Sequence, residues 1–359
     1  MRTARGMKVI AVAVAGGLAL TACGEAPEET PGTDSSAGTY QTCMVTDIGG
    51  IDDRSFNTSA FKGLTDAAAE SDLFAEPVNT SSEAEADYEP NLTQYAQGDC
   101  DFILAVGGLM GDATNKIAAQ FPDKQFAIVD FKAEPSNVYS MQFDTAQAAF
   151  LAGYLAAGYS KSGVVATYGG LNIAPVTIFM DGFVDGVAYY NEKKGASVQV
   201  LGWDKESQTG TFAESFVDQA RGKALSDAFV AQGADVIFPV AGGTGLGTAA
   251  AAQASNGQYV VIWVDIDGCE SAAQYCDVFL STVVKNIPDA VKEAALKAST
   301  SSGLLTGGTI GTLANNGVSL APYHEFEDDV SDELKAEIEQ LKQDIISGAV
   351  KVESPSQPK

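Results

Sequence analysis

The chain has 359 residues, of which 45% are hydrophobic, 21 are Lys or Arg and 47 are Asp or Glu, so its formal net charge is −26 at pH 7. At roughly 150 residues per domain, this length is enough for two domains with hydrophobic cores. The negative charge argues against nucleic acid and anionic lipid surfaces as partners, because both repel the chain at long range. A neutral or cationic small ligand suits this field better than a phosphorylated one.

The first 23 residues, MRTARGMKVIAVAVAGGLALTAC, have the pattern of an export signal. Basic residues precede an apolar run at 9–20 that is too short to span a bilayer as a mature helix. The run ends in LTAC, which resembles a bacterial lipobox, where the signal is cut before the Cys and its thiol carries lipid. We predict a signal peptide at 1–22 and a lipid anchor on Cys23 outside the cytoplasmic membrane. An ordinary signal with an incidental Cys is the alternative.

Residues 23–39 are rich in Gly, Pro, Ser, Thr and acid and offer almost nothing to bury. This composition predicts a disordered tether. The lipid would then be the protein's only contact with the membrane.

Four cysteines follow the tether, an even number in an oxidising compartment, and three pairings are possible. Cys269 and Cys276 bracket a short loop, and Cys43 and Cys100 each stand close to an apolar strand. We favour the pairs Cys43–Cys100 and Cys269–Cys276, with free buried thiols as the alternative. The sequence has one His, His324, and no C-x-x-C pair, so we expect no metal site and interpret His324 as a surface or packing residue.

Short apolar runs bounded by Gly, Asn or Asp alternate with helical patterns, which is typical of βαβ units and a parallel sheet. The first set has strands at 42–47, 101–108, 125–131 and 137–143, with helices at 57–72 and 111–122. The pattern restarts after Phe143 with strands at 163–170, 198–203, 234–242 and 259–265 and helices at 145–159, 178–194 and 216–232. A strand and helix at 277–300 and an amphipathic helix from Ser331 with a final strand complete the second half.

Polar or Gly-rich stretches follow many of these strands: Asp47 to Phe61, GGLMGDA, Asp130, GGLNIAPVTIF, AGGTGLGT and DIDG. Ligands of open parallel sheets collect at the carboxyl ends of strands. If two α/β lobes face each other, these stretches converge on one crevice. Asp265 ends a fully apolar strand and so points at that crevice, whereas Asp52 and Asp53 fit solvated loop carboxylates better than a catalytic pair or a cation site.

Several local patterns leave more than one interpretation open. AGGTGLGT at 241–248 is either a tight turn or a loop whose amides bind a polar ligand edge, but it is not a phosphate-binding loop because no Gly-Lys-Ser/Thr follows. Phe56, Phe61, Met110 and Phe179 either pack beneath loops or grip a flat ring, which stacking favours by ~1–3 kcal/mol per base. A single His and the absence of G-x-S-x-G argue against nucleophilic catalysis, so we expect no enzyme activity and no cofactor.

The motif VTDIGGIDDRSFNTSAFKGL resembles the opening of the basic membrane protein family of bacterial lipoproteins. These are the substrate-binding subunits of ABC importers, and they include the purine nucleoside receptors. The similarity continues in order through NLTQYAQGDCDFILAVGGLMGDA, AAFLAGYLAA, GFVDGV, GADVIFPVAGGTGLG and VDIDG followed by STVVKN. It covers nearly the whole mature chain.

This resemblance implies a type I periplasmic-binding fold, in which two doubly wound parallel-sheet lobes are joined by three crossovers. Lobe 1 would comprise 40–143 and 266–302, and lobe 2 would comprise 144–265 and 303–353. The crossings would then fall near Phe143, near Asp265 and around 302–308.

The resemblance also implies how a nucleoside would be held. Carried onto matching positions, it assigns the base to Phe56 and Phe179, first-lobe polar contacts to Asp47, Asn57 and Asp130, backbone contacts to Gly242 and Gly243, and the ribose to Asp265 and Lys285. The protein would be a monomeric, lipid-anchored receptor that passes a small neutral ligand to ABC permease and ATPase subunits. A surface sensor for a sugar or another small polar solute, and a secreted nucleoside hydrolase, are the alternatives.

Overall fold

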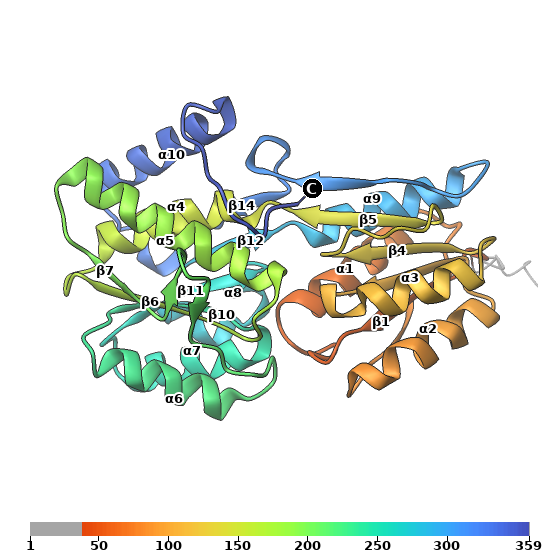
Figure 1. The fold of residues 1–359 in the computed structure, drawn as a ribbon, viewed down its shortest axis with the longest axis horizontal. Coiled ribbons are helices and arrows are strands. Elements are labelled where there is room, and N and C mark those ends of the chain that lie inside the picture. The colour runs from red at the N-terminus through yellow and green to blue at the C-terminus, as the bar shows by residue number, and fades with distance from the viewer. Residues whose placement is uncertain (1–37, 359) are drawn as a thin grey trace, which may run out of the picture. The chain divides into compact units, whose positions relative to one another are not determined.

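The computed structural model describes residues 38–358, which form two six-stranded sheets with helices on their faces (Figure 1). The predicted signal peptide, the lipid-carrying Cys23 and the predicted tether up to residue 37 lie outside the described residues. Both sheets belong to one compact unit, Ala37–Lys359. Within the described part of the chain, no helix is long and apolar enough to cross a membrane.

The first sheet is entirely parallel. Its strands run in the order β13 (Gly308–Gly311), β5 (Val138–Phe143), β4 (Gln125–Val129), β3 (Phe102–Val106), β1 (Thr42–Thr46) and β2 (Val78–Thr80). Its helices are α1 (Phe56–Glu70), α2 (Tyr88–Gln97), α3 (Gly111–Gln120) and α9 (Ile287–Thr300). Every residue of β1, β3 and β4 is buried, as expected for strands covered on both faces.

The second sheet is parallel except for its last strand, which pairs antiparallel with its neighbour. The order is β14 (Val318–Leu320), β12 (Phe279–Lys285), β11 (Val260–Asp265), β10 (Val236–Val240), β6 (Val164–Gly169) and β7 (Gln199–Leu201). Its helices are α4 (Thr145–Tyr159), α5 (Ala174–Lys194), α6 (Gln219–Val230), α7 (Gly245–Ala254), α8 (Gly268–Ser271) and α10 (Asp332–Ser347). A small antiparallel ribbon lies beside β6 and consists of β8 (Trp203–Asp204) and β9 (Thr209–Gly210).

The α/β class with two parallel-sheet lobes is confirmed, and the chain passes between the sheets three times. The first passage follows β5, where Phe143 was predicted to end lobe 1. The second follows β12 rather than Asp265, because the apolar run of β12 pairs in parallel with β11 of the second sheet. The third follows β13 rather than residues 302–308, because β13 adds to the edge of the first sheet through β5.

The C-terminal segment also differs from expectation, because residues 349–358 form no strand. Side-chain hydrogen bonds tie this segment to the second lobe instead. Ser354 Oγ donates to Asp181 Oδ2 at 2.6 Å, and Gln357 Nε2 donates to Asp144 Oδ2 at 3.1 Å. Asp144 directly follows β5, so the segment ends beside the first passage between the sheets, as Figure 1 shows.

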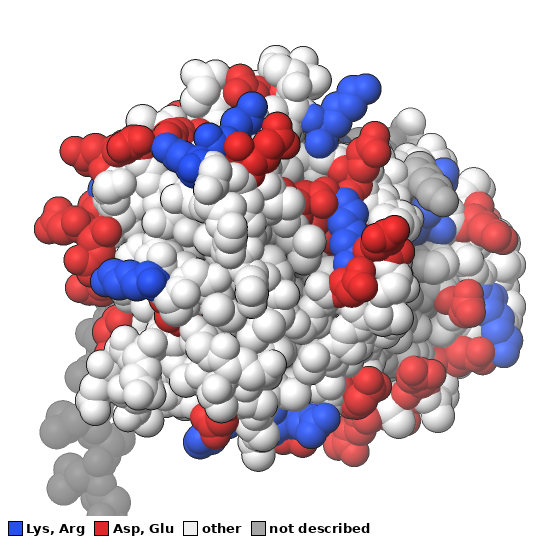
Figure 2. All heavy atoms as spheres, turned by 60° about the vertical axis from the view of Figure 1, so that its left-hand side comes forward, with Lys and Arg blue, Asp and Glu red and all other residues white. Residues whose placement is uncertain are grey.

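Both predicted disulfide pairings, Cys43–Cys100 and Cys269–Cys276, are confirmed. The first joins β1 to the residue two positions before β3, within the first lobe. On the face drawn in Figure 2, the Lys and Arg side chains lie beside acidic ones and do not gather into a basic patch. That face therefore offers no electrostatic footprint for a polyanion.

Candidate functional site

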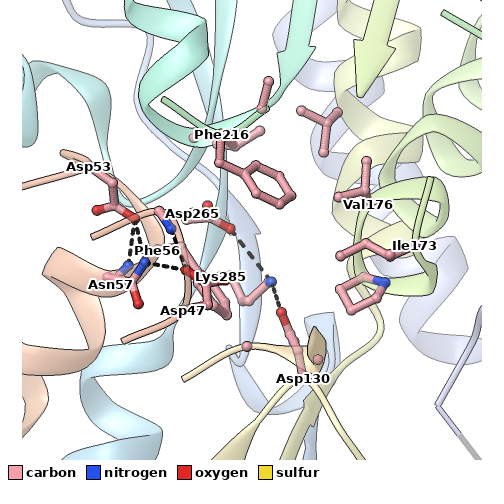
Figure 3. A pocket seen from close by; sticks show the side chains of 18 of the residues that line it. Asp47, Asp53, Phe56, Asn57, Asp130, Ile173, Val176, Phe216, Asp265 and Lys285 are labelled. Atoms are coloured by element: carbon pink, nitrogen blue, oxygen red, sulfur yellow. Dashed lines mark hydrogen bonds and ion pairs between the residues drawn. The ribbon is translucent and has the colours of Figure 1, made fainter. Parts of the chain in front are cut away.

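A pocket lies where the carboxyl ends of strands from both sheets meet (Figure 3). Its first-lobe residues are Asp47, Gly49, Asp53, Phe56, Asn57, Gly107, Gly108 and Asp130. Its second-lobe residues are Ile173, Pro175, Val176, Phe179, Phe216, Val240, Ala241, Gly242, Val264, Asp265 and Lys285. The cavity measures about 60 Å³, which is room for a few water molecules, so a larger ligand enters only if the walls separate.

Asp53 organises the start of α1. Its carboxylate accepts hydrogen bonds from the backbone N–H groups of Ser55 at 3.0 Å, Asn57 at 2.7 Å and Thr58 at 3.1 Å, the groups that a helix N-terminus leaves without intrahelical partners. The expectation of a solvated Asp53 is wrong, since its exposed fraction is 5%. Burial raises the pKa of Asp53 to about 6 although these N–H groups stabilise the charged form.

Asn57 joins two carboxylates of the first lobe. Its Nδ2 donates to Asp47 Oδ1 at 2.9 Å and to Asp53 Oδ2 at 3.2 Å. These two bonds fix the amide orientation and leave Oδ1 buried with no hydrogen-bond partner among residues 38–358. Asn57 therefore holds an unused acceptor at the pocket.

The Asp47 carboxylate packs closely against the backbone of Gly107. Gly107 has a φ of +116°, and a Cβ at this position would lie 2.7 Å from Asp47 Oδ2. Burial raises the pKa of Asp47, although hydrogen bonds from Asn57 and from the Gly49 N–H act in the opposite direction. A side chain at position 107 would displace this carboxylate.

Lys285 is a buried cation between carboxylates of the two lobes. Its Nζ lies 2.6 Å from Asp130 Oδ2 and 3.6 Å from Asp265 Oδ1, and its side chain is 3% exposed. Burial opposes the charge on Lys285, but the two carboxylates outweigh it and raise the lysine pKa. Ser55 adds a link between the lobes by donating from Oγ to Asp265 Oδ2 at 2.6 Å.

Asp130 and Asp265 share an unusual backbone conformation. Asp130 directly follows β4 with φ 65°, and Asp265 ends β11 with φ 69°. Left-handed conformations are uncommon for residues other than Gly, although Asp is among those that tolerate them. Each sheet thus turns one strand-end carboxylate toward Lys285 (Figure 3).

Three aromatic rings reach the pocket. The Lys285 ammonium lies 4.7 Å from the centre of the Phe56 ring and 5.2 Å from that of Phe179, within range of cation–π attraction. Phe56 is half-buried, whereas Phe179 is 2% exposed and packs against Phe238. Phe216 is half-buried, and Figure 3 shows its ring projecting into the pocket.

The structure brings together all the predicted ligand-binding residues except Gly243. Gly242 lines the pocket, but Gly243 faces the backbone around Phe216 in the turn before α7. Phe61 and Met110, which were open between packing and ligand contact, both pack in the first lobe and do not line the pocket.

Sequence reasoning missed Phe216 and assigned Asp53 to solvent. It expected the stretches that hold Gly107 and residues 173–176 at the crevice but did not name these residues as ligand contacts. Phe216 was assigned to the first turn of a predicted helix, but α6 begins at Gln219, so the ring belongs to the preceding loop. Gly107 directly follows β3 and opens the stretch GGLMGDA, which the rule that parallel strands carry ligands at their carboxyl ends had placed at the crevice.

Comparisons of the sequence with a family model and with known proteins indicate the same family. Residues 40–356 match the family described as "ABC transporter substrate-binding protein PnrA-like". The chain is 32% identical to a "CD4+ T-cell-stimulating antigen" of Listeria innocua over 97% of this chain and 98% of that protein. It is 31% identical to the "ABC transporter nucleoside-binding protein BmpA" of Lactococcus lactis over 98% of this chain and 99% of that one.

Among solved structures, an ABC transporter solute-binding protein from Aeropyrum pernix superposes with a TM-score of 0.78 at 24% identity, covering 89% of this chain and 94% of that chain. At this level of identity, the likeness establishes the solute-binding-protein fold.

Proposed function

Because this chain belongs to the Bmp family of PnrA-like ABC transporter substrate-binding proteins, we propose that it binds a nucleoside between its two lobes and delivers it to an ABC importer. The observation that carries the proposal is the chemistry of the pocket. Four carboxylates, one lysine and the half-buried rings of Phe56 and Phe216 line it. A ligand that fits must be flat in one part and rich in hydrogen-bond donors in another.

The polar atoms of the pocket are mostly acceptors, which selects against anions. A phosphate group would lie among Asp47, Asp53, Asp130 and Asp265 with Lys285 as its only cationic partner in the pocket, and that lysine is already paired twice. A neutral nucleoside instead offers ring N–H or amino donors and ribose hydroxyls. Carboxylates and the unused Oδ1 of Asn57 accept hydrogen bonds from such groups.

The flat base would stack between Phe56 and Phe216. We prefer Phe216 to Phe179 as the second platform because a ring that is 2% exposed has almost no face left for a ligand. The ribose would lie near Asp130, Asp265 and Lys285, which reach the cavity from both sheets. A site that hydrogen-bonds a hydroxyl can reject the analogue lacking it by ~10⁴-fold, because its buried polar groups are left unpaired.

The experiment is a thermal-shift and calorimetric screen of protein that has been unfolded and refolded to remove bound ligand. Nucleosides, free bases, nucleotides and sugars are compared at equal concentration. A nucleoside at 100 times its Kd stabilises the fold by ~2.7 kcal/mol. We expect stabilisation by nucleosides, with at least tenfold weaker binding of the matching nucleotide and dideoxynucleoside. Silence from every nucleoside together with a response to a sugar would refute the nucleoside assignment.

Phe56→Ala and Phe61→Ala form a matched pair for this screen. Both residues are half-buried and both lie on α1, but only Phe56 lines the pocket. Loss of the platform should weaken nucleoside binding at least tenfold, whereas Phe61→Ala should leave the affinity unchanged. Equal losses in both variants would point to damage in α1 and not to stacking.

We further propose that the protein is a monomer held outside the cytoplasmic membrane by lipid on Cys23. Metabolic labelling with a radiolabelled fatty acid tests the anchor, because Cys23→Ala should abolish labelling. The receptor role predicts that the ligand leaves unchanged, so chromatography after prolonged incubation should recover intact nucleoside. Free base and ribose in that sample would favour a hydrolase.

A further inference from the structure

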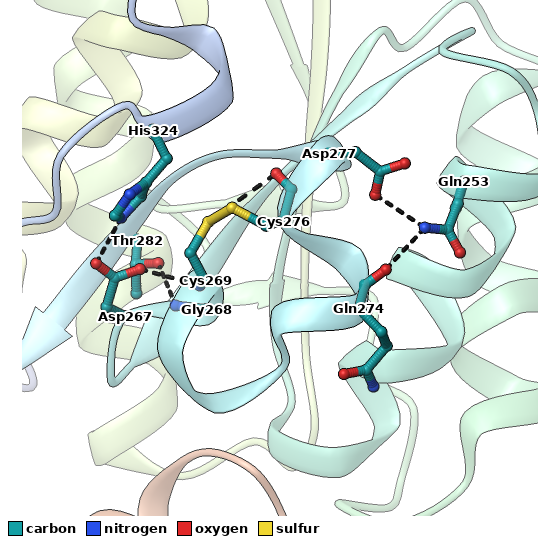
Figure 4. The surroundings of a disulfide bond; sticks show 9 residues. All are labelled: Gln253, Asp267, Gly268, Cys269, Gln274, Cys276, Asp277, Thr282 and His324. Atoms are coloured by element: carbon teal, nitrogen blue, oxygen red, sulfur yellow. Dashed lines mark hydrogen bonds and ion pairs between the residues drawn. A yellow bond between two sulfur atoms is a disulfide. The ribbon is translucent and has the colours of Figure 1, made fainter.

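Donor atoms of three side chains converge beside the second disulfide, outside the ligand pocket. A carboxylate oxygen of Asp267, Sγ of Cys269 and a ring nitrogen of His324 all lie within 4.8 Å of one another. Figure 4 shows His324 reaching Asp267 from another part of the chain, next to the sulfur–sulfur bond. His324 is the only histidine of the sequence. An oxygen, a sulfur and an imidazole nitrogen form a ligand set that zinc accepts.

Hydrogen bonds already hold the Asp267 and His324 side chains next to each other. Asp267 Oδ2 lies 2.7 Å from His324 Nε2, and Asp267 Oδ1 accepts a hydrogen bond from the Cys269 N–H at 3.0 Å. His324 has a φ of 44°, a left-handed conformation that is uncommon outside Gly. The carboxylate and the imidazole therefore need little rearrangement to share an ion.

The loop that carries the sulfurs is anchored independently of the disulfide. The Gly268 N–H donates to Thr282 Oγ1 on β12 at 3.1 Å. At the other end, Gln253 Nε2 on α7 donates to the Gln274 carbonyl and to Asp277 Oδ1, both at 2.8 Å (Figure 4). Breaking the disulfide would therefore leave Cys269 and Cys276 near their present positions.

We propose that the Cys269–Cys276 disulfide gates a zinc site formed by Asp267, Cys269 and His324, with Cys276 as the fourth ligand. A dithiol reductant transfers two electrons and two protons to the sulfur–sulfur bond, giving two thiols, and is itself oxidised to a disulfide. Zn²⁺ then binds both sulfurs as thiolates, which releases two protons. In the oxidised protein neither sulfur is a thiolate, and the thiolate is the form that binds metal.

Solvent access and the chemistry of the donor atoms favour this site. The His324 and Asp267 side chains are 32% and 15% exposed, and both cysteines are half-buried, so an ion and a small reductant can reach them. The ion would brace the loop that begins immediately after Asp265, and so would take over the crosslink's structural role when the disulfide is open. Sulfur and imidazole donors favour Zn²⁺ over Mg²⁺ or Ca²⁺, which prefer oxygen.

The test uses the purified full chain with and without a phosphine reductant, and Zn²⁺ as the probe. After metal addition, free thiols are alkylated and mapped by peptide mass spectrometry, which separates Cys269 and Cys276 from the other cysteines. We expect Zn²⁺ to slow alkylation of both residues at least tenfold in the reduced protein, and Mg²⁺ to have no effect. Titration with Co²⁺ should give a thiolate charge-transfer band that Zn²⁺ abolishes.

His324→Gln is the decisive variant, because it removes one ligand from the surface and leaves the cysteines in place. It should weaken Zn²⁺ protection at least tenfold, while the alkylation rate without metal stays the same. Cys269→Ser with Cys276→Ser should lose the Co²⁺ band entirely. Equal protection in the parent and in His324→Gln, or a reduced parent with no Co²⁺ band, overturns the proposal.

Discussion

Replacing Lys285 with Met should destabilise the protein strongly, because it leaves a buried carboxylate without its cation. Lys285 Nζ lies 2.6 Å from Asp130 Oδ2 and 3.6 Å from Asp265 Oδ1. At an effective dielectric constant of about 20, these separations correspond to attractions of about 6 and 5 kcal/mol. The cost of burying the lysine offsets much of this attraction, and removing one partner of a buried pair typically costs about 3–5 kcal/mol. We expect a loss in that range at pH 8.

The loss should depend on pH with a definite sign. Without Lys285, burial raises the pKa of Asp130 further above that of the unfolded chain. A carboxyl group with a raised folded pKa contributes stability below the unfolded pKa, and this contribution is lost as pH rises through the folded pKa. The difference between the parent and Lys285→Met should therefore be smallest near pH 4 and grow toward pH 8.

The assay is urea unfolding followed by circular dichroism at several pH values, with disulfides intact and ligand removed. Lys285→Met with Asp130→Asn should recover at least half of the lost stability, because the unpaired charge is gone. Lys297→Met is the matched control, since its partner Glu293 lies 3.2 Å away on an exposed helix face, and such pairs contribute about 0–1 kcal/mol. The buried ion pair would be contradicted if Lys285→Met and Asp130→Asn had additive effects on the unfolding free energy. It would also be contradicted if the stability loss in Lys285→Met did not vary with pH.

The pocket and its supports carry three more predictions. Phe216→Ala should weaken nucleoside binding at least tenfold by calorimetry with an unchanged unfolding midpoint, and an unchanged affinity would exclude this ring from the site. Asp53→Asn should remove a pH dependence of the unfolding free energy worth roughly 3 kcal/mol. The Asp53 pKa is about 6 in the folded protein, so the contribution of this group to stability is lost as pH rises from about 4 through 6. Parallel stability–pH curves for the parent and the variant would argue against that pKa. Gly107→Ala should lower the unfolding free energy by about 1–3 kcal/mol and also weaken ligand binding, because the new Cβ displaces Asp47. Gly163→Ala is the control: at φ +73°, with nothing within 4 Å of the added Cβ, it should affect stability alone. Equal losses of affinity in the two variants would contradict the steric argument.

The α/β class and the strand-end stretches that line the pocket could be predicted from local patterns, whereas the ligand roles of Asn57 and Lys285 followed only from the family resemblance. Uninterrupted apolar runs become parallel strands, and polar residues at their carboxyl ends, such as Asp47, Asp130 and Asp265, meet where the sheets face each other. The passages between the lobes depend on which sheet a strand joins. An apolar run such as β12 satisfies either sheet equally well, so its own residues do not reveal its partner.

Phe216 and Asp53 were missed for a different reason. Helix boundaries are the least reliable part of a sequence interpretation, and a boundary three residues too early moved Phe216 from a loop into a helix. Asp53 lies in a polar loop, where solvation is the usual outcome. Its actual role depends on three backbone N–H groups at the start of α1, and those become available only once the helix has formed.

The contacts around Lys285 suggest how ligand binding and closure of the lobes are linked. Asp130 belongs to the first lobe, whereas Lys285 and Asp265 belong to the second, so the buried ion pair itself holds the lobes together. The cavity between them has room for only a few waters, so the proposed nucleoside would enter only after the walls of the pocket separate. Binding is then strong only if the ligand's hydroxyls restore hydrogen bonds to the carboxylates that the opening exposes. Selectivity for ribose would thus arise from the same residues that hold the two lobes together.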